Sequence, residues 1–504
     1  MKHQYLRNFA ASAAVVLLLP VPAQAGLSAL DVWNGIRSYV ESAGQAVSVG
    51  SQSSEGTSLL LRDVKVSAEM PDGTFAATID LLEFRERSDG TVDVTMSPDV
   101  PLSVLFQPPE GESLDLTMIF RQSGLSLVAS GDPDSISFDY LAARFGLELD
   151  KMFVDGEAVD LQAGVAFSDI DGRYELSKGE ETRYSSTSSV AEVTYEVKLK
   201  VPEEEGSFDL SGSVSGLQTS SAMTFPSDLD LSDPGALFAA GVVLGGQASG
   251  GASSMKAAVV DGEEEFEFES SSQGGRLTFS IDNGVLRYGG GAEGVSYKVR
   301  SPQIPVPELS FDMAEVSAEM AMPMMKTEDF RDFGLALRIR ELALDEMLWM
   351  MFDPGAALPR DPFSFVIGLS GKMRFLVDMA DPQAVEAFQG NSPAEVESLA
   401  FDEFRLAGLG AEIGGNGSFT FDNSDTGTFG GLPAPEGGFR LELAGINGLL
   451  DRLVGMGLLP DDQAMGARMM LGLFARPAGG EDRMVSEIEV RPDGSIFANG
   501  QQLK

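Results

Sequence analysis

The side chains that carry most enzyme chemistry are missing from nearly the whole of this sequence. The chain has no cysteine, and its single histidine, His3, lies close to the start. Without imidazole or thiol beyond that point, a Ser-His-Asp triad, a cysteine nucleophile and ordinary zinc, haem or iron–sulfur sites are excluded. Paired carboxylates remain, since they can hydrolyse a glycosidic bond. Because 77 acidic residues make close pairs expected by chance, the sequence favours a non-enzymatic role, with a carboxylate-based hydrolase as the alternative.

One segment has the oxygen-rich spacing of a calcium loop. Asp422-Asn423-Ser424-Asp425-Thr426-Gly427 resembles the first half of a hand-type loop, with glycine at its sixth position. The twelfth position, which requires a bidentate glutamate, is Pro433. The segment therefore predicts an Asx-type turn rather than a calcium site.

A methionine-rich segment raises the question of copper. Met320, Met322, Met324 and Met325 offer thioethers, which are ligands for Cu(I). Methionine is also a pliable filler of apolar cores, and the chain places Met347, Met350 and Met351 on an expected apolar helix. We interpret these methionines as packing residues and predict no metal, no cofactor and no catalytic residue.

Residues 1–25 have the pattern of a cleavable secretory signal peptide. Basic Lys2 and Arg7 precede an apolar segment at 9–19, and Ala23-Gln24-Ala25 forms a small-x-small cleavage site. Cleavage there makes Gly26 the first mature residue. A lipoprotein signal would need a cysteine at that point, and the chain has none, so we expect no lipid anchor. No later segment reaches the eighteen or so uninterrupted apolar residues of a transmembrane helix.

The charge of the chain restricts its partners. The formal net charge is −42, from 77 acidic and 35 basic side chains. Nucleic acids and anionic membranes bind clusters of Lys and Arg, so neither is expected as a partner. The hydrophobic fraction of 43% is that of a globular chain. We therefore expect a folded, exported protein with an acidic surface.

Most of the mature sequence alternates between apolar and polar residues. In segment 192–201 the odd positions are apolar and the even positions are polar or charged, which predicts a half-solvated antiparallel strand. Similar alternation recurs at 265–269, 277–281, 373–379, 419–421, 439–443 and 484–491. Turn signals separate such segments, as at Asp171-Gly172, Asp282-Asn283-Gly284 and Pro492-Asp493-Gly494. The chain is thus expected to consist mainly of hairpins.

Helices are expected to be few and short. An amphipathic helix is predicted at 26–43, with Ser28 as its cap, and shorter helices are predicted at 234–244 and 345–352. Residues 445–474 predict a helical hairpin, with helices at 445–456 and 461–474 joined by a turn that ends in Pro460.

Two β-rich halves are expected within the mature chain. The Gly- and Ser-rich segment 245–254 is the candidate linker. It divides an N-terminal half, residues 26–244, from a C-terminal half, residues 255–504, that contains the helical hairpin.

Two stretches resemble a known group of proteins. They are the mature start, Val32-Trp33-Asn34-Gly35 followed by Ala43-Gly44 and segment 59–64, and the end, from Pro492-Asp493-Gly494 to Asn499-Gly500. Both are similar to an uncharacterised family of exported Gram-negative bacterial proteins, known as a domain of unknown function. The resemblance implies a periplasmic, β-rich protein and supplies no catalytic residues.

The predicted fold class is α+β, mostly antiparallel β, with long or curled sheets and a few short helices. An outer-membrane barrel is the main alternative, because alternating strands of about ten residues are its signature. Two Trp and eight Tyr are few for aromatic girdles, and the helical hairpin interrupts the strands.

A sheet with one apolar face must bury that face, and the expected helices are too few to cover it. We therefore expect a non-enzymatic envelope scaffold or binding module, with an apolar groove for a lipid or an envelope protein. A second sheet packed on the first would remove the groove, and both arrangements remain open at this point.

Overall fold

The computed structural model describes residues 27–42, 44–201, 206–226, 241–262, 264–379, 386 and 392–504. The chain divides into two compact units, Met1–Glu269 (unit 1) and Ser270–Lys504 (unit 2). Strands account for 67% of the structure and helices for 10%, so the predicted mostly antiparallel β fold is confirmed. Residues 1–25, which the sequence predicts to be a signal peptide, lie outside the described residues. Among those residues, no helix combines the length and apolar character needed to cross a membrane.

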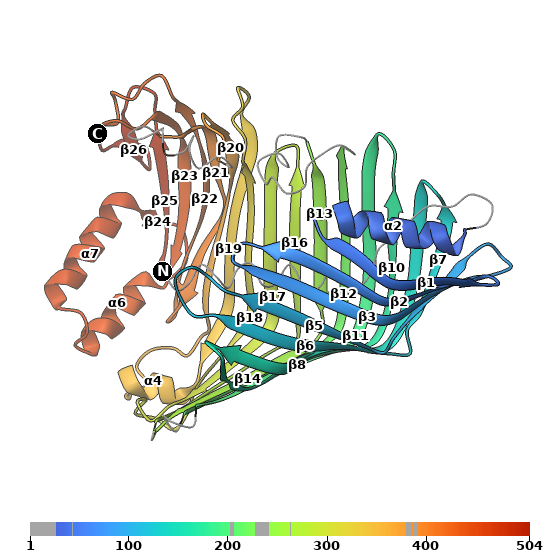
Figure 1. The fold of residues 1–504 in the computed structure, drawn as a ribbon. Coiled ribbons are helices and arrows are strands. Elements are labelled where there is room, and N and C mark those ends of the chain that lie inside the picture. Colours follow the sequence, from blue (N-terminus) through green and yellow to red (C-terminus); the bar gives the residue numbers. More distant parts are fainter. Residues whose placement is uncertain are drawn as a thin grey trace. The chain divides into compact units, whose positions relative to one another are not determined.

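Unit 1 is built from antiparallel strands (Figure 1). Their bounds are β1 (Ala46–Glu55), β2 (Ser58–Met70), β3 (Gly73–Glu86), β4 (Val92–Met96), β5 (Asp99–Phe106), β6 (Leu114–Ser123), β7 (Ser126–Asp132), β8 (Ser135–Val154), β9 (Glu157–Ala158), β10 (Asp160–Ser177), β11 (Glu181–Val201), β12 (Gly206–Pro226), β13 (Val243–Gly250) and β14 (Ser253–Asp261). The next strand, β15 (Glu264–Ser272), contains the division between the units.

Three long strands of unit 1 are each shared between two shorter neighbours. The first part of β3 pairs with β5 and the last part with β4. Likewise β8 pairs with β7 and then β6, and β12 pairs with β14 and then β13. This arrangement allows strands of unequal length to continue one sheet without leaving long unpaired edges.

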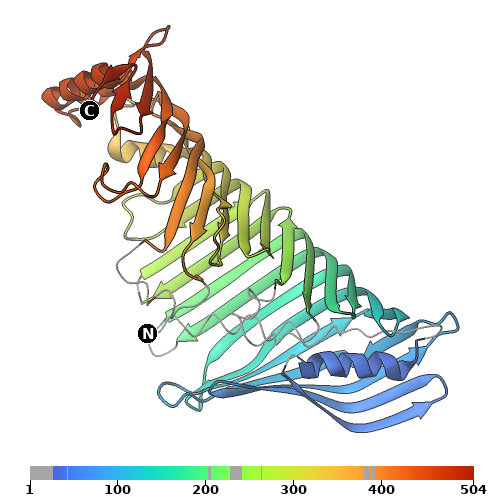
Figure 2. The same cartoon turned by 90° about the horizontal axis from the view of Figure 1, so that it is seen from above.

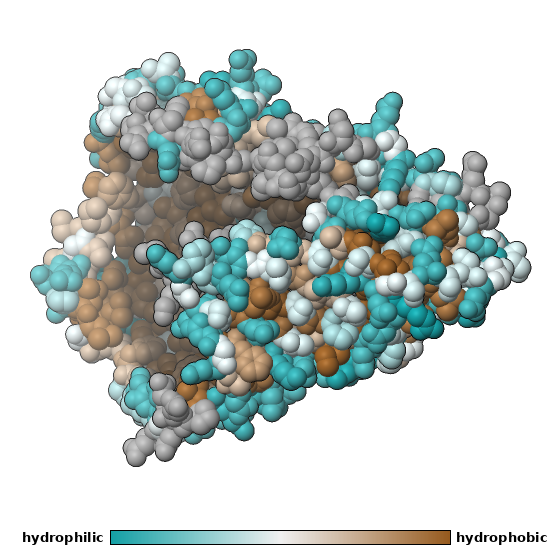
Figure 3. Space-filling model, viewed as in Figure 1, coloured by the Kyte–Doolittle hydropathy of each residue, from teal (hydrophilic) through white to brown (hydrophobic). Residues whose placement is uncertain are grey.

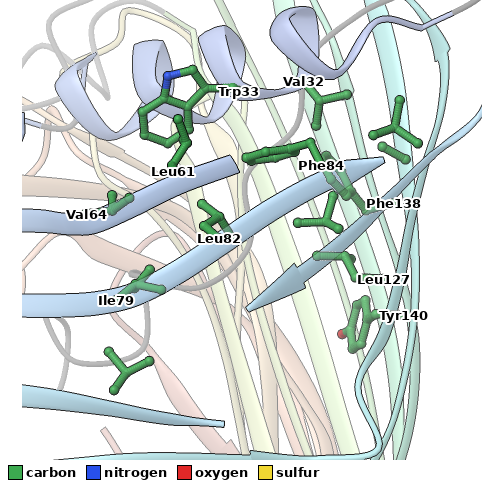
Figure 4. Close-up of a cluster of buried hydrophobic side chains, with 14 of the residues drawn as sticks. Val32, Trp33, Leu61, Val64, Ile79, Leu82, Phe84, Leu127, Phe138 and Tyr140 are labelled. Carbon is green, nitrogen blue, oxygen red and sulfur yellow. The ribbon is translucent and has the colours of Figure 1, made fainter. Parts of the chain in front are cut away.

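The core of unit 1 lies under helix α2 (Ala29–Ser42). The N–H of Asp31 donates to Oγ of Ser28 over 3.1 Å, which confirms the predicted cap. Val32 and Trp33 are buried against the strands, and the Trp33 ring lies 6.1 Å from that of Phe84 (Figure 4). Both clusters of buried apolar side chains found among the described residues lie in unit 1.

Unit 2 is a ladder of antiparallel strands in chain order, from yellow-green to red in Figure 2. The strands are β16 (Gly274–Asp282), β17 (Val285–Arg300), β18 (Leu309–Pro323), β19 (Arg331–Leu344), β20 (Phe363–Phe375), β21 (Ala394–Gly408), β22 (Ala411–Asp422), β23 (Ala434–Ala444), β24 (Arg476–Pro477), β25 (Arg483–Val490), β26 (Ile496–Ala498) and β27 (Gln501–Gln502). From β16 to β23 each strand pairs with the next, and β23 pairs with β25.

Three helices are described in unit 2. Helix α4 (Glu346–Phe352) is capped by Asp345, which accepts from the N–H of Leu348 over 2.8 Å. Helices α6 (Ile446–Gly455) and α7 (Asp461–Phe474) form the predicted hairpin. The sequence-based predictions of helices at 345–352 and 445–474 are therefore confirmed.

Two local predictions were wrong, and a third is tested only at its C-terminal end. The Asp171-Gly172 pair lies inside β10, where Gly172 pairs with Tyr140 of β8, instead of forming a turn. The candidate linker 245–254 belongs to β13 and β14, which pair with β12. Of the helix predicted at 234–244, residues 234–240 lie outside the described part, and Val243 and Leu244 begin β13.

Candidate functional site

One row of directly opposed residues crosses nine strands of unit 2. The register places on one face of the sheet, in order, Phe279, Tyr288, Met320, Leu335, Leu369, Phe401, Gly417, Phe439 and Ile488. At about 4.8 Å between neighbouring strands, the row extends for about 38 Å. None of its side chains is charged. We call this the apolar row.

Apolar residues farther along the same strands extend the row into an apolar face. They are Leu277, Leu286, Met322, Phe333, Leu337, Ile367, Leu399, Phe404, Leu406, Ile413, Phe419, Leu441, Leu443, Met484 and Val490. We refer to the row and these neighbours together as the apolar face.

The apolar face remains accessible to solvent. Tyr288 and Leu335 are each 47% exposed, and Leu406 is 46% exposed. The other side chains of the row are half-buried. Figure 3 shows the corresponding region as brown side chains over the strands labelled β20 to β25 in Figure 1. A sheet with one such face normally buries it against another layer.

Aromatic side chains cover the glycines of this face. The ring of Phe439 lies over the strand next to its own, and a Cβ on Gly417 would come within 2.7 Å of it. Phe333 lies over Gly371 in the same way. At these two positions the rings cover backbone that the glycines would otherwise leave exposed on the face.

The opposite face of the same strands is charged and internally paired. Cross-strand ion pairs join Arg338 to Glu319 at 3.5 Å and Arg440 to Glu487 at 2.6 Å. A trough of about 800 Å³ on this face runs over Gly289, Ala336 and Gly368. At the trough, Glu319 also pairs with Arg276 at 3.3 Å, so its charge is compensated by two arginines. The two faces of the sheet therefore have opposite chemistry.

The segment considered for calcium forms the predicted Asx turns. Oδ1 of Asp422 accepts from the N–H of Ser424 over 2.9 Å, and Oδ1 of Asp425 accepts from the N–H of Gly427 over 3.0 Å. The hydroxyl groups of Ser424 and Thr428 also donate to Asp422 and Asp425, and these bonds, followed by the backbone bonds, lower the pKa of both carboxyl groups. Among the described residues, no group of three or more acidic, His or Cys side chains is placed to hold a metal ion.

The methionines considered for copper have different surroundings. Met320 and Met322 lie in β18, where they face Leu335 and Leu286 of the apolar face. Met324 follows the strand, and Met325 lies against Gly284. Of the four candidates, only Met320 and Met322 lie within a strand of the apolar face.

The hydrolase alternative needs a carboxyl group that stays protonated near neutral pH. The resolved pKa shifts of carboxyl groups in the described part of the chain are all downward. For Asp353, burial would raise the pKa, but hydrogen bonds from the N–H of Leu358 and from Arg360 outweigh burial and lower it. These groups are suited to accepting hydrogen bonds as carboxylates.

Comparison of the chain with protein-family models, with curated proteins and with solved structures finds no match. The candidate site is an accessible apolar face, about 38 Å long at strand spacing, whose reverse side is charged. Sequence alternation identified many of its strands, but not the register that brings their apolar residues into one row.

Proposed function

We propose that this protein is an exported, non-enzymatic binding module or scaffold of the cell envelope that holds lipid hydrocarbon chains on the apolar face of unit 2. The observation that carries the proposal is the apolar row, which crosses nine strands without a charged side chain. A hydrocarbon chain has no polar groups, so this surface can bind it through apolar contact alone.

The dimensions of the row are consistent with acyl chains. A bilayer core of about 30 Å gives each lipid about 15 Å of hydrocarbon depth. The apolar row is about 38 Å long at normal strand spacing. An acyl chain therefore fits along the row with its polar headgroup left at a rim, in contact with water.

The first 25 residues support the proposed location outside the cytoplasm. Their basic, apolar and small-x-small segments are those of a secretory signal. The resemblance of the mature start and of the end of the chain to exported Gram-negative proteins points to the periplasm. A periplasmic carrier must shield hydrocarbon from water, which the apolar face is suited to do.

A neutral hydrophobic dye, Nile red, tests the proposal. An uncharged probe is needed because a chain of formal charge −42 repels anionic dyes. We expect the native protein, stripped of lipid, to enhance the dye's fluorescence, and Leu335→Asp to reduce the enhancement strongly. Leu141→Asp is the matched control, because Leu141 is 53% exposed but belongs to unit 1.

Two results would overturn the proposal. One is native protein that leaves the dye dark until it unfolds. The other is an equal loss of fluorescence in both variants, which would place the dye elsewhere. Circular dichroism of each variant establishes that the strands are intact.

A further inference from the structure

Helix α7 carries apolar side chains on the side that faces away from its packing partner. Ala464 is 1% exposed and marks the packed side. Met465, Met469 and Leu473, spaced four residues apart, are 63%, 72% and 48% exposed. Met470 beside them is 56% exposed. We call these four residues the methionine stripe.

A surface helix of a soluble protein normally has charged residues on its outer side. The acidic residues of α7, Asp461 and Asp462, lie in its first turn. Its one basic residue, Arg468, pairs with Asp451 of α6 at 2.5 Å. A helix that is apolar on its outer side as well as its packed side needs a partner for the outer side.

The hairpin is fixed to the end of the apolar face. The carbonyl oxygen of Phe474, at the end of α7, accepts from Oγ of Ser486 over 2.6 Å and from Nδ2 of Asn499 over 2.9 Å. Ser486 lies in β25 directly opposite Leu441 of the apolar face. The methionine stripe is thus carried by a helix that ends where the proposed hydrocarbon site ends.

The charge of the hairpin is low for this chain. Residues 445–475 contain three acidic and two basic side chains, whereas the whole chain has a formal charge of −42. This segment can approach a lipid surface with less repulsion than the average surface of the protein. The stripe also lacks the Trp, Tyr and Arg that dominate protein interfaces. A lipid surface of low charge fits it better than a protein.

We propose that α6 and α7 form a docking element that inserts the methionine stripe into the surface of an uncharged lipid layer. Acyl chains then pass between that layer and the apolar face at the β25 end. The transfer of acyl chains to the apolar face rests on the proposed function, whereas docking on the lipid layer does not. Because insertion depends on apolar contact, it should change little with salt.

Flotation with vesicles of pure phosphatidylcholine tests the docking element. We expect the full mature protein to float with the vesicles equally at about 0.05 M and about 0.5 M salt. The double variant Met465→Gln, Met469→Gln should lower the partition coefficient by on the order of tenfold. Met350→Gln, Met351→Gln on α4 is the matched control, since these residues are 55% and 52% exposed. The control should bind as the unmodified protein does.

Several outcomes would overturn docking: no flotation of the unmodified protein, equal loss in both double variants, or binding only to anionic vesicles at low salt. A change in self-association without a change in flotation would assign the stripe to a protein contact and also contradict the proposal. The experiments can contradict one proposal without contradicting the other. Protein that floats but holds no lipid contradicts the proposed function alone, whereas lipid-bearing protein that does not float contradicts docking alone.

Discussion

The rings of Phe401 in β21 and Phe439 in β23 meet edge to face across Gly417, with centroids 5.0 Å apart and planes at 86°. The intervening strand contributes no side chain, so residues two strands apart come into contact. The contact closes a gap in the middle of the apolar row. It is both a stabilising interaction of unit 2 and part of the surface proposed to hold lipid.

Removal of this contact should weaken unit 2. For Phe439→Ala we expect a loss of about 2 kcal/mol, less than for a fully buried Phe because the ring is half-buried. The urea midpoint followed by circular dichroism measures the loss. Phe266→Ala, at a Phe that is 39% exposed in β15, is the control and should have a smaller effect. Equal midpoints for the two variants would contradict the role of the ring pair.

Acid should weaken the N-terminus of α6 through Asp482. Its carboxylate accepts from the N–H of Gly448 over 2.9 Å and from the side chain of Asn447 over 2.8 Å. Burial would raise the pKa of Asp482, but these bonds outweigh burial and lower it. A lowered pKa means that the stabilisation is present above the unfolded value, about 4, and is lost as pH falls below it.

The variant Asp482→Asn isolates this effect. We expect the unmodified protein to be more stable than the variant by about 1 kcal/mol at neutral pH, and the difference to shrink near pH 3. Thermal midpoints at both pH values measure it. Asp461→Asn, in the first turn of α7, is the control. A difference independent of pH would show that the charge of Asp482 does not contribute.

Alkali should weaken unit 1 through a tyrosine cluster. The Tyr184 ring lies 5.5 Å from that of Tyr39 on α2 and 6.1 Å from that of Tyr174 on β10. Burial raises the pKa of all three phenols. A raised pKa means that this stabilisation is complete below the unfolded value, about 10, and is lost as pH rises above it.

Tyr184→Phe keeps an aromatic ring against Phe225, whose ring stacks on Tyr184 at 5.6 Å, and removes one titrating group. Stability should fall with pH above about 10 less steeply in the variant, by up to about 1.4 kcal/mol per pH unit. Urea midpoints between pH 8 and pH 11 measure the slope. Parallel curves for the two proteins would refute the assignment.

Export predicts the start of the mature chain. Cleavage after Ala25 leaves Gly26 as the first residue. Mass spectrometry of protein from the periplasmic fraction should give that N-terminus. Envelope protein that retains Met1 would contradict a cleaved signal.

The sequence predicted individual strands well because alternation is a local property. Segment 192–201 lies in β11 with the faces expected, since Val193 is buried and Lys198 pairs with Glu196 at the surface. The turn at Asp282-Asn283-Gly284 was also right, because Asn283 and Gly284 both have the positive φ that such a turn needs.

The errors arose where neighbouring strands decide the structure. Gly172 is needed because the ring of Tyr140 occupies the space of its missing side chain, not because the chain turns. The Gly- and Ser-rich segment 245–254 forms strand because β12 supplies hydrogen bonds along it. Local composition cannot indicate such partners.

The site was predictable only in part for the same reason. Each strand's apolar residues can be read from the sequence, but the row from Phe279 to Ile488 depends on eight pairings between strands. The accessibility of that row depends on whether another layer covers it, which alternation does not encode. The sequence likewise could not predict which side of α7 is exposed, because the packing of α7 against α6 decides which methionines face solvent.

Native mass spectrometry of protein purified without detergent, combined with organic extraction, tests the central claim most directly. We predict a mass above that of the mature polypeptide, loss of the excess on extraction, and acyl lipids in the extract. Leu335→Asp should lower the lipid-bound fraction, and Leu141→Asp should not. Protein that carries only the mass of the bare chain, with no lipid in the extract, would contradict the claim that the apolar face holds hydrocarbon.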